Sequence, residues 1–150
     1  LLDTIDCVIL GYYYGRGKRA AFGIGAILVG VYNKKEDNFQ TVAKIGTGFS
    51  DEEWRELKKK CDAISIKEKP KNVICDRDLY PDVWVRLEIV IEIMADEITR
   101  SPIHTAGQTD RDIGLALRFP RFIRYRPDKD RYETTAVSEL RRLFNQQHKK

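Results

Sequence analysis

The chain has 150 residues, with 42% hydrophobic and 33% charged residues and a mean hydropathy of -0.47. This composition excludes a fibrous or disordered chain and predicts a single domain over residues 1–150. The formal net charge of +4 is weak evidence for a polyanionic partner. No segment has the roughly 18 apolar residues that a membrane span requires. Because the chain does not begin with Met, we expect it to be a piece of a longer protein.

The sequence does not predict a metal centre. Cys7, Cys61 and Cys75 are far apart and share no C-x-x-C spacing, so we expect neither a disulfide framework nor a zinc site. The odd number of cysteines is typical of a reducing, intracellular compartment, which is the cytoplasm or nucleoid in a prokaryote and the nucleus in a eukaryote. His104 lies in a predicted loop, where we expect it to form hydrogen bonds rather than to catalyse a reaction.

The first part of the chain predicts three antiparallel strands in a meander. Apolar and aromatic runs cover Asp6–Tyr14, Phe22–Tyr32 and Phe39–Thr47. A glycine-bearing loop, Gly15–Arg19, separates the first two runs, and a polar turn, Asn33–Asn38, separates the last two. Glycines within such runs indicate the bulges and bends of a small, strongly coiled barrel.

An amphipathic helix follows the third strand. The segment Ser50-Asp51-Glu52-Glu53 matches a capping box, in which the serine hydroxyl and the last glutamate satisfy free N–H groups at a helix start. Trp54, Leu57 and Cys61 then recur at helical spacing and predict the buried face. We expect this helix to close one end of a barrel.

The second half of the chain predicts two long strands and a closing helix. Within Val83–Ile93 every second residue is apolar and Arg86, Glu88 and Glu92 lie between them, which predicts one strand; Leu115–Arg126 is a strand that Pro120 must interrupt. Ser101–Asp112 is expected to be a loop, and Thr134 or Thr135 to cap the last helix. Five strands with one helix after the third predict a mainly β OB fold, a five-stranded Greek-key barrel with one capping helix and a C-terminal helix. An SH3-like barrel is the nearest alternative.

Positive charge is concentrated near the C-terminus. Between residues 118 and 129 the sequence has five cations and one acid, so this segment contributes +4 and the rest of the chain sums to zero: Arg118, Arg121, Arg124, Arg126 and Lys129 against Asp128. Apolar residues alternate with the arginines, which predicts a strand with one packed face and one cationic face. A second acid-free cluster, Arg16, Lys18 and Arg19, lies in the glycine-bearing loop.

The segment Arg118 to Lys129 resembles the last signature motif of ATP-dependent DNA ligases, which their C-terminal OB domain carries. Further blocks resemble the same domain in the same order, nearest the archaeal and eukaryotic replicative type: Asp3-Thr4-Ile5-Asp6, Gly11 through Arg19, Lys44 through Ser50, Pro81-Asp82-Val83-Trp84, Ile98 through Pro102, and Thr134-Thr135.

The resemblance implies a role in a three-step reaction. In this family a lysine of the nucleotidyltransferase domain takes AMP from ATP, AMP passes to the 5′-phosphate of a nick, and the 3′-hydroxyl displaces it. By resemblance Arg126, Asp128 and Lys129 form the R-x-D-K element that contacts the ATP phosphates. The chain lacks the K-x-D-G lysine, so we expect it to be inactive alone. ATP and Mg²⁺ are then cofactors of the parent enzyme, and none is expected to bind this chain tightly.

The resemblance also implies DNA contacts. Five cations are candidates for phosphate contact: Arg16, Lys18, Arg19, Arg118 and Arg121. Phe119 resembles a residue that packs into the minor groove beside the nick, and its alternative role is core packing. The expected partners are nicked double-stranded DNA and the parent's own nucleotidyltransferase domain, in a monomeric protein.

Two other functions compete with this interpretation. One is a free-standing nucleic-acid-binding OB module, specific for single strands and without an enzymatic role. The other is the equivalent domain of an RNA ligase or mRNA capping enzyme, against which the block Arg118 to Ile123 argues.

Overall fold

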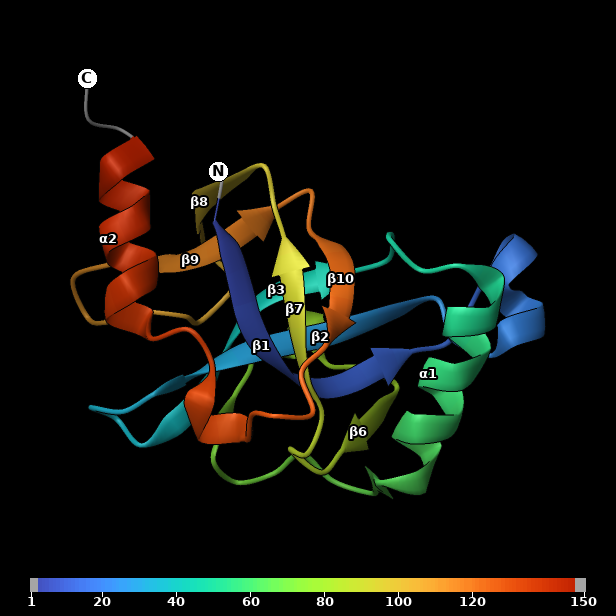
Figure 1. The fold of residues 1–150 in the computed structure, drawn as a ribbon. Helices are drawn as coiled ribbons and strands as arrows, with labels where there is room; N and C mark the ends of the chain where they lie inside the picture. Colours follow the sequence, from blue (N-terminus) through green and yellow to red (C-terminus); the bar gives the residue numbers. More distant parts are fainter. Residues whose placement is uncertain (1–2, 148–150) are drawn as a thin grey trace.

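In the computed structural model, which describes residues 3–147, a strongly curled β-sheet forms the centre of the protein (Figure 1). Strands β1 (Thr4–Tyr13), β2 (Ala26–Asn33) and β3 (Asn38–Ile45) pair antiparallel in chain order. The predicted meander is therefore confirmed. The hairpin between β2 and β3 turns at residues 34–37.

The central strand β1 is shared by three neighbours. Its first half pairs with β7 (Val90–Met94) and its last residues pair with β6 (Val83–Val85), while β2 lies along its other edge. The remaining strands extend this sheet: β10 (Arg121–Tyr125) on β7, β5 (Val73–Ile74) on β3 and β4 (Ser65–Ile66) on β6. Because β1 must bend between two partners, the sheet curls into a half-barrel (Figure 1).

The bend in β1 requires a glycine. The β1–β2 register shifts between Ile9 and Gly11, which marks a bulge. A Cβ atom on Gly11 would lie 2.4 Å from the carbonyl oxygen of Val83 in β6. Only a residue without a side chain allows the two backbones to approach this closely.

The prediction of one strand over Val83–Ile93 is wrong. The chain forms β6 and β7 instead, with a break over residues 86–89, where the Glu88 amide donates to the carbonyl of Arg86 at 2.9 Å. The alternation of apolar residues runs through both strands. Trp84 and Val90, at the intervening positions, are buried as well, so the alternation predicted neither this second buried face nor the break, which arises because β6 and β7 pair with different parts of β1.

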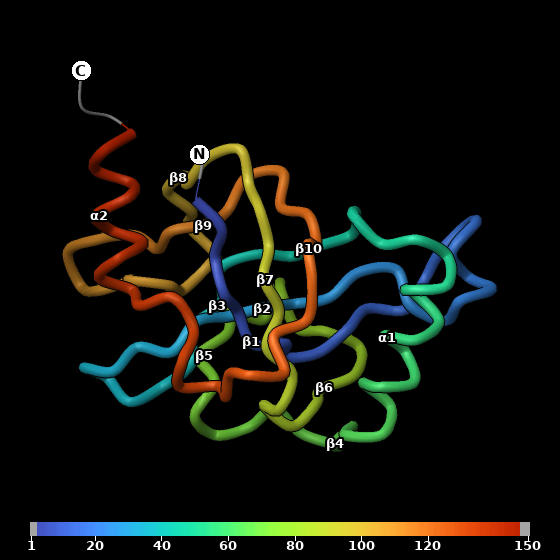
Figure 2. The backbone as a smooth tube through the Cα atoms, in the orientation of Figure 1, coloured from blue at the N-terminus to red at the C-terminus, as the bar shows by residue number. Residues whose placement is uncertain are grey.

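The sequence predicted neither the short strands β4 and β5 nor a strand before the loop at Ser101. Glu97–Ser101 forms β8, which pairs with β9 (Gly114–Arg118) in a separate two-stranded sheet. The predicted strand Leu115–Arg126 is interrupted at Pro120, as expected, and its two parts, β9 and β10, belong to different sheets. Figure 2 shows the path of the backbone from β9 in one sheet to β10 in the other.

Helix α1 (Asp51–Ala63) is capped as predicted. The amide of Glu53 donates to Ser50 Oγ at 3.1 Å, and the amide of Ser50 donates to Glu53 Oε1 at 2.9 Å. The predicted face is confirmed, because Trp54, Leu57 and Cys61 are all buried. Short 3-10 helices cover Gly17–Phe22, within and after the predicted glycine-bearing loop, Arg77–Leu79 and Arg131–Glu133.

Helix α2 (Val137–Gln147) is not capped by the predicted threonines. The hydroxyl of Thr134 accepts a hydrogen bond from the Tyr32 amide, and the hydroxyl of Thr135 accepts one from the Asp6 amide, at 2.8 and 2.9 Å. Both threonines therefore attach the segment before the helix to the sheet. Neither α1 nor α2 has the length and apolarity to cross a bilayer.

The core lies on both faces of the curled sheet. Ile5, Cys7 and Ile9 of β1 join a cluster that includes the buried faces of α1 and α2. Val8 and Leu10 join a second cluster, under the irregular segment that contains Leu79. Alternate residues of β1 thus face two apolar layers, so a polar side chain on this strand is an exception.

Candidate functional site

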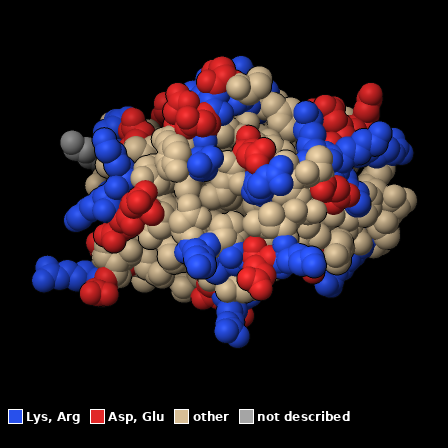
Figure 3. All heavy atoms as spheres, turned by 90° about the horizontal axis from the view of Figure 1, so that it is seen from below, with Lys and Arg blue, Asp and Glu red and all other residues tan. Residues whose placement is uncertain are grey.

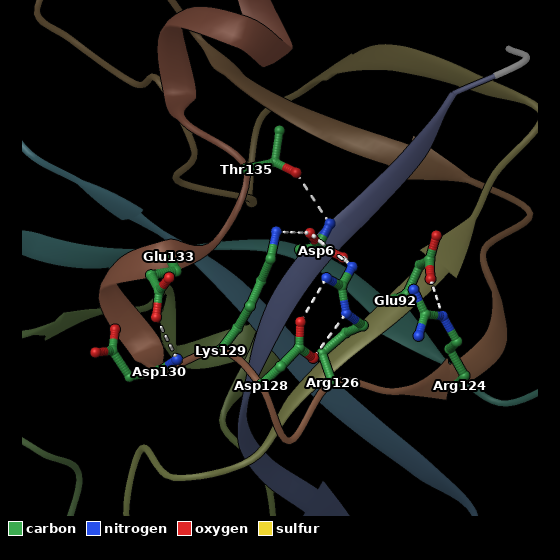
Figure 4. Close-up of polar contacts among 9 residues, drawn as sticks. All are labelled: Asp6, Glu92, Arg124, Arg126, Asp128, Lys129, Asp130, Glu133 and Thr135. Carbon is green, nitrogen blue, oxygen red and sulfur yellow. Dashed lines mark hydrogen bonds and ion pairs between the residues drawn. The ribbon is translucent and has the colours of Figure 1, made fainter.

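The chain leaves β10 at Arg126 and enters a short turn that presents the predicted R-x-D-K element (Figure 4). Arg126 donates to both carboxylate oxygens of Asp128, from Nε at 3.0 Å and from Nη2 at 2.9 Å. This charge-assisted, bidentate contact lowers the pKa of Asp128 to about 2 and raises the pKa of Arg126. The two residues therefore form a charged pair at neutral pH.

A carboxylate that was not a predicted site residue, Asp6 in β1, holds the other side of this element. Lys129 Nζ lies 2.7 Å from Asp6 Oδ2, and Arg126 Nη1 lies 3.4 Å from Asp6 Oδ1. The side chains of Asp6, Arg126 and Lys129 are 14%, 16% and 28% exposed, so the cluster is largely buried but open to solvent at Lys129. One sequence feature could have identified Asp6 as a site residue. It is an acid between two apolar residues, Ile5 and Cys7, in a strand that packs on both faces.

The other cations of the segment are paired as well. Arg118 contacts Glu97 at 2.8 Å and Arg121 contacts Asp96 at 3.0 Å, while Arg124 pairs with Glu92. The excess of positive charge within residues 118–129 is thus balanced in space by acids from β1, β7 and the segment into β8. On the face of the molecule seen in Figure 3, basic and acidic side chains are interspersed.

Phe119 lies at the turn between β9 and β10 and is not part of the core. Its side chain is 62% exposed, which rules out the alternative of core packing. Its φ of 53° is in the left-handed region, which is unusual for a bulky residue. The Thr47 hydroxyl donates to the carbonyl of Pro120 at 3.1 Å, and this bond holds the turn against the loop after β3. The structure therefore projects an aromatic ring into solvent from an anchored turn.

The glycine-bearing loop contributes two exposed cations. Arg16 and Lys18 are exposed and, among residues 3–147, have no ion-pair partner. Arg19 differs, because its guanidinium donates to the carbonyl of Gly25 at 2.9 Å and lies over the ring of Trp54. Arg16 and Arg19 line a groove of about 700 Å³, together with Tyr13, Tyr14, Lys44, Tyr80 and others.

The predicted site residues do not form one cluster. The 3-10 helix Gly17–Phe22 lies beside α1, whereas the β9–β10 turn and the R-x-D-K element lie at opposite ends of β10 (Figure 1). The structure brings Arg126, Asp128 and Lys129 together, and it places Arg118, Phe119 and Arg121 around one turn. Arg16, Lys18 and Arg19 form a third group.

The histidine and cysteine side chains in the described part of the chain do not form a candidate site. His104 is buried in the predicted loop, where its amide donates to Ser101 Oγ at 3.0 Å, while its Nδ1 has no hydrogen-bond partner and burial lowers its pKa to about 4. Burial also raises the pKa of Cys61 to about 12 and of Cys75 to about 11. Within residues 3–147, no three His, Cys, Asp or Glu side chains are placed to hold a metal ion.

The comparisons with known proteins agree on one family. A family model described as the ATP dependent DNA ligase C terminal region matches residues 20–129. The chain is 53% identical over 150 residues to a probable DNA ligase of Dictyoglomus turgidum, and 43% identical over 152 residues to a DNA ligase of Saccharolobus solfataricus. These alignments cover 99% and 100% of this chain but only 25% of each relative. The chain thus spans about a quarter of the length of these curated relatives.

A solved structure supports the fold. The ligase domain of LigD from M. tuberculosis superposes with a TM-score of 0.66 at 26% identity, over 89% of this chain and 38% of that chain. A mycobacterial DNA ligase D complexed with ATP and MES superposes with a TM-score of 0.61 at 25% identity, over 89% of this chain and 37% of that chain. The mainly β OB fold predicted from the element order is confirmed.

Proposed function

The chain belongs to the family of C-terminal regions of ATP-dependent DNA ligases, and from this membership we propose that it is the OB domain of such an enzyme. It first assists transfer of AMP from ATP to a lysine of the parent's nucleotidyltransferase domain. It then closes over nicked duplex DNA for sealing. The observation that carries this proposal is the R-x-D-K element, whose Lys129 is held at the surface by a fixed carboxylate.

The adenylylation role follows from charge. When a lysine attacks the α-phosphate of ATP, negative charge develops on the departing pyrophosphate. A preorganised cation beside it stabilises the transition state more than the ground state. Lys129 has the charge for this contact and is partly exposed, while Arg126 and Asp128 fix the turn that carries it. The side chains fit a polyphosphate, and Mg²⁺ would be supplied with ATP in the parent enzyme.

The DNA role uses different surfaces. Phe119 is an exposed ring on an anchored turn, which suits an apolar wedge in a minor groove beside a nick. Arg16 and Lys18 are exposed and can meet phosphates without first breaking an ion pair. The separation of these groups from the R-x-D-K element fits a domain that presents one surface to ATP and others to DNA.

The test compares two steps of the reaction in the full-length ligase. We expect Lys129→Ala to slow self-adenylylation by about 10²- to 10³-fold, as is typical when one contact to a developing charge is lost. Sealing of a nick that already carries AMP should be much less affected. Lys67→Ala is the matched control, because Lys67 is an exposed lysine outside the three groups. Equal losses in both steps would contradict the proposed role.

A further inference from the structure

The two cations of the cluster, Arg126 and Lys129, differ in how accessible they are to a ligand. All three guanidinium nitrogens of Arg126 are engaged, Nε and Nη2 with Asp128 and Nη1 with Asp6. Lys129 Nζ has a single hydrogen-bond acceptor in the described part of the chain, Asp6 Oδ2. Because an ammonium group has three N–H donors, two remain for a phosphate. Arg126 uses three of its five N–H donors and its side chain is 16% exposed, whereas the side chain of Lys129 is 28% exposed, so Lys129 is the more accessible cation of this element.

The carboxylate that holds Lys129 is itself rigidly placed. Asp6 lies between two fully buried residues, Ile5 and Cys7, in the part of β1 that pairs with β7. Its amide donates to the Thr135 hydroxyl at 2.9 Å, and its carbonyl accepts from the Thr135 amide at 3.0 Å. Figure 4 shows Lys129 and Arg126 converging on this one side chain from the turn after β10. The sheet and Thr135 thus fix the backbone of Asp6, and the short aspartate side chain leaves its carboxylate little freedom of position.

From this geometry we infer that Asp6 is a positioning residue for self-adenylylation, which fixes the Lys129 ammonium group where the leaving phosphates of ATP arrive. This inference rests on the proposed function. A lysine side chain has four flexible methylene groups, so a free Lys129 would occupy many positions. A catalytic cation contributes most when it needs no rearrangement as charge develops. The Asp6 carboxylate provides that order and leaves two ammonium donors for the substrate.

The experiment is a double-mutant cycle in the full-length ligase, with self-adenylylation measured over a single turnover across a range of ATP concentrations. Asp6→Asn keeps the shape and the backbone bonds but removes the charge. We expect it to lower the rate at saturating ATP by about tenfold or more, with a smaller change in the ATP concentration for half-saturation. In the Lys129→Ala background the same change should have a much smaller effect, because only the long contact of Asp6 with Arg126 remains.

The controls separate positioning from folding. Asp62→Asn removes a carboxylate that pairs with Lys58 and accepts from the Tyr12 hydroxyl, and it should leave the rate unchanged. Asp6→Glu keeps the charge but moves it by one methylene group, and it should fall between wild type and Asp6→Asn, which provides a test if Asp6→Asn does not fold. Additive losses in the cycle, or an unchanged Asp6→Asn rate, would overturn the inference. An unaffected Lys129→Ala rate would instead overturn the proposed function.

Discussion

Asp6 and Glu92 lie directly opposite each other in the β1–β7 strand pair, so two carboxylates share one position of the ladder. Each is neutralised by cations from β10 and the turn after it, Glu92 by Arg124 and Asp6 by Arg126 and Lys129. A hydrogen bond from Thr4 and the pairing with Arg124 hold the pKa of Glu92 below its usual range. A phosphate that reaches this surface therefore meets a preformed network of ion pairs rather than isolated cations.

The exposed ring of Phe119 should matter for sealing and not for adenylylation. We expect Phe119→Asn to slow sealing of a pre-adenylylated nick by about tenfold, since loss of one aromatic contact to a base typically costs about 1–3 kcal/mol. Asn tolerates the left-handed backbone at this position, so the turn should persist. Phe119→Trp keeps a ring and is the control. If Phe119→Asn seals at the wild-type rate in single-turnover assays, the wedge role is wrong.

The salt dependence of DNA binding should depend on the glycine-bearing loop. If the five predicted cations each met a phosphate, log affinity would fall with log salt at a slope near -4 to -5. Arg118 and Arg121 have ion-pair partners and Arg19 is held by Gly25, so Arg16 and Lys18 should dominate. We expect their joint replacement by Ala to reduce the slope by about 2 for nicked duplex in the full-length ligase.

The control for this measurement is the double Ala variant of Lys34 and Lys35, which are exposed at the β2–β3 turn. It should leave the slope unchanged. Equal effects of the two double variants would show that binding follows net charge rather than the loop. Tighter binding of the wild-type ligase to single-stranded DNA than to nicked duplex would contradict the proposed DNA role.

The chain alone should not react with ATP. It lacks a K-x-D-G lysine, and burial raises the pKa of each of its cysteines, so no cysteine offers a reactive thiolate. We expect incubation with radiolabelled ATP and Mg²⁺ to leave no AMP attached to the protein. A stable protein-bound label on a denaturing gel would contradict the proposal that adenylylation needs the parent's other domain.

His104 should make the domain less stable in mild acid. Burial lowers the pKa of His104 from its usual 6.5 to about 4, so between these values the unfolded chain binds a proton that the folded chain does not. The free energy of unfolding should therefore fall as pH decreases from 6.5 toward 4. The depressed carboxylates, such as Glu92 and Asp128, add their own loss only below about pH 5. Urea titrations between pH 7 and 5 should show this slope, and His104→Gln should flatten it; an equal slope in the variant would exclude His104 as the cause.

Local signals in the sequence predicted the elements well where the causes are local. The capping box at Ser50 and the apolar face of Trp54, Leu57 and Cys61 depend on residues within three turns, and both are confirmed. The break at Pro120 follows from the missing N–H of proline. The strand Val83–Ile93 was predicted wrongly because its alternation continues through a change of pairing partner.

The sequence alone determined the family, the OB fold and the identity of the R-x-D-K element, because motif order and periodicity are properties of neighbouring residues. Only the tertiary structure decided which acids pair with the cations of this segment. Lys129 and Asp6 are 123 positions apart, and no pattern along the chain reveals that the curled sheet brings them to 2.7 Å. Folding thus converts a segment with an excess of positive charge into a neutral network, because ion pairing depends on distance in space, which the bend of β1 and the path of β10 determine.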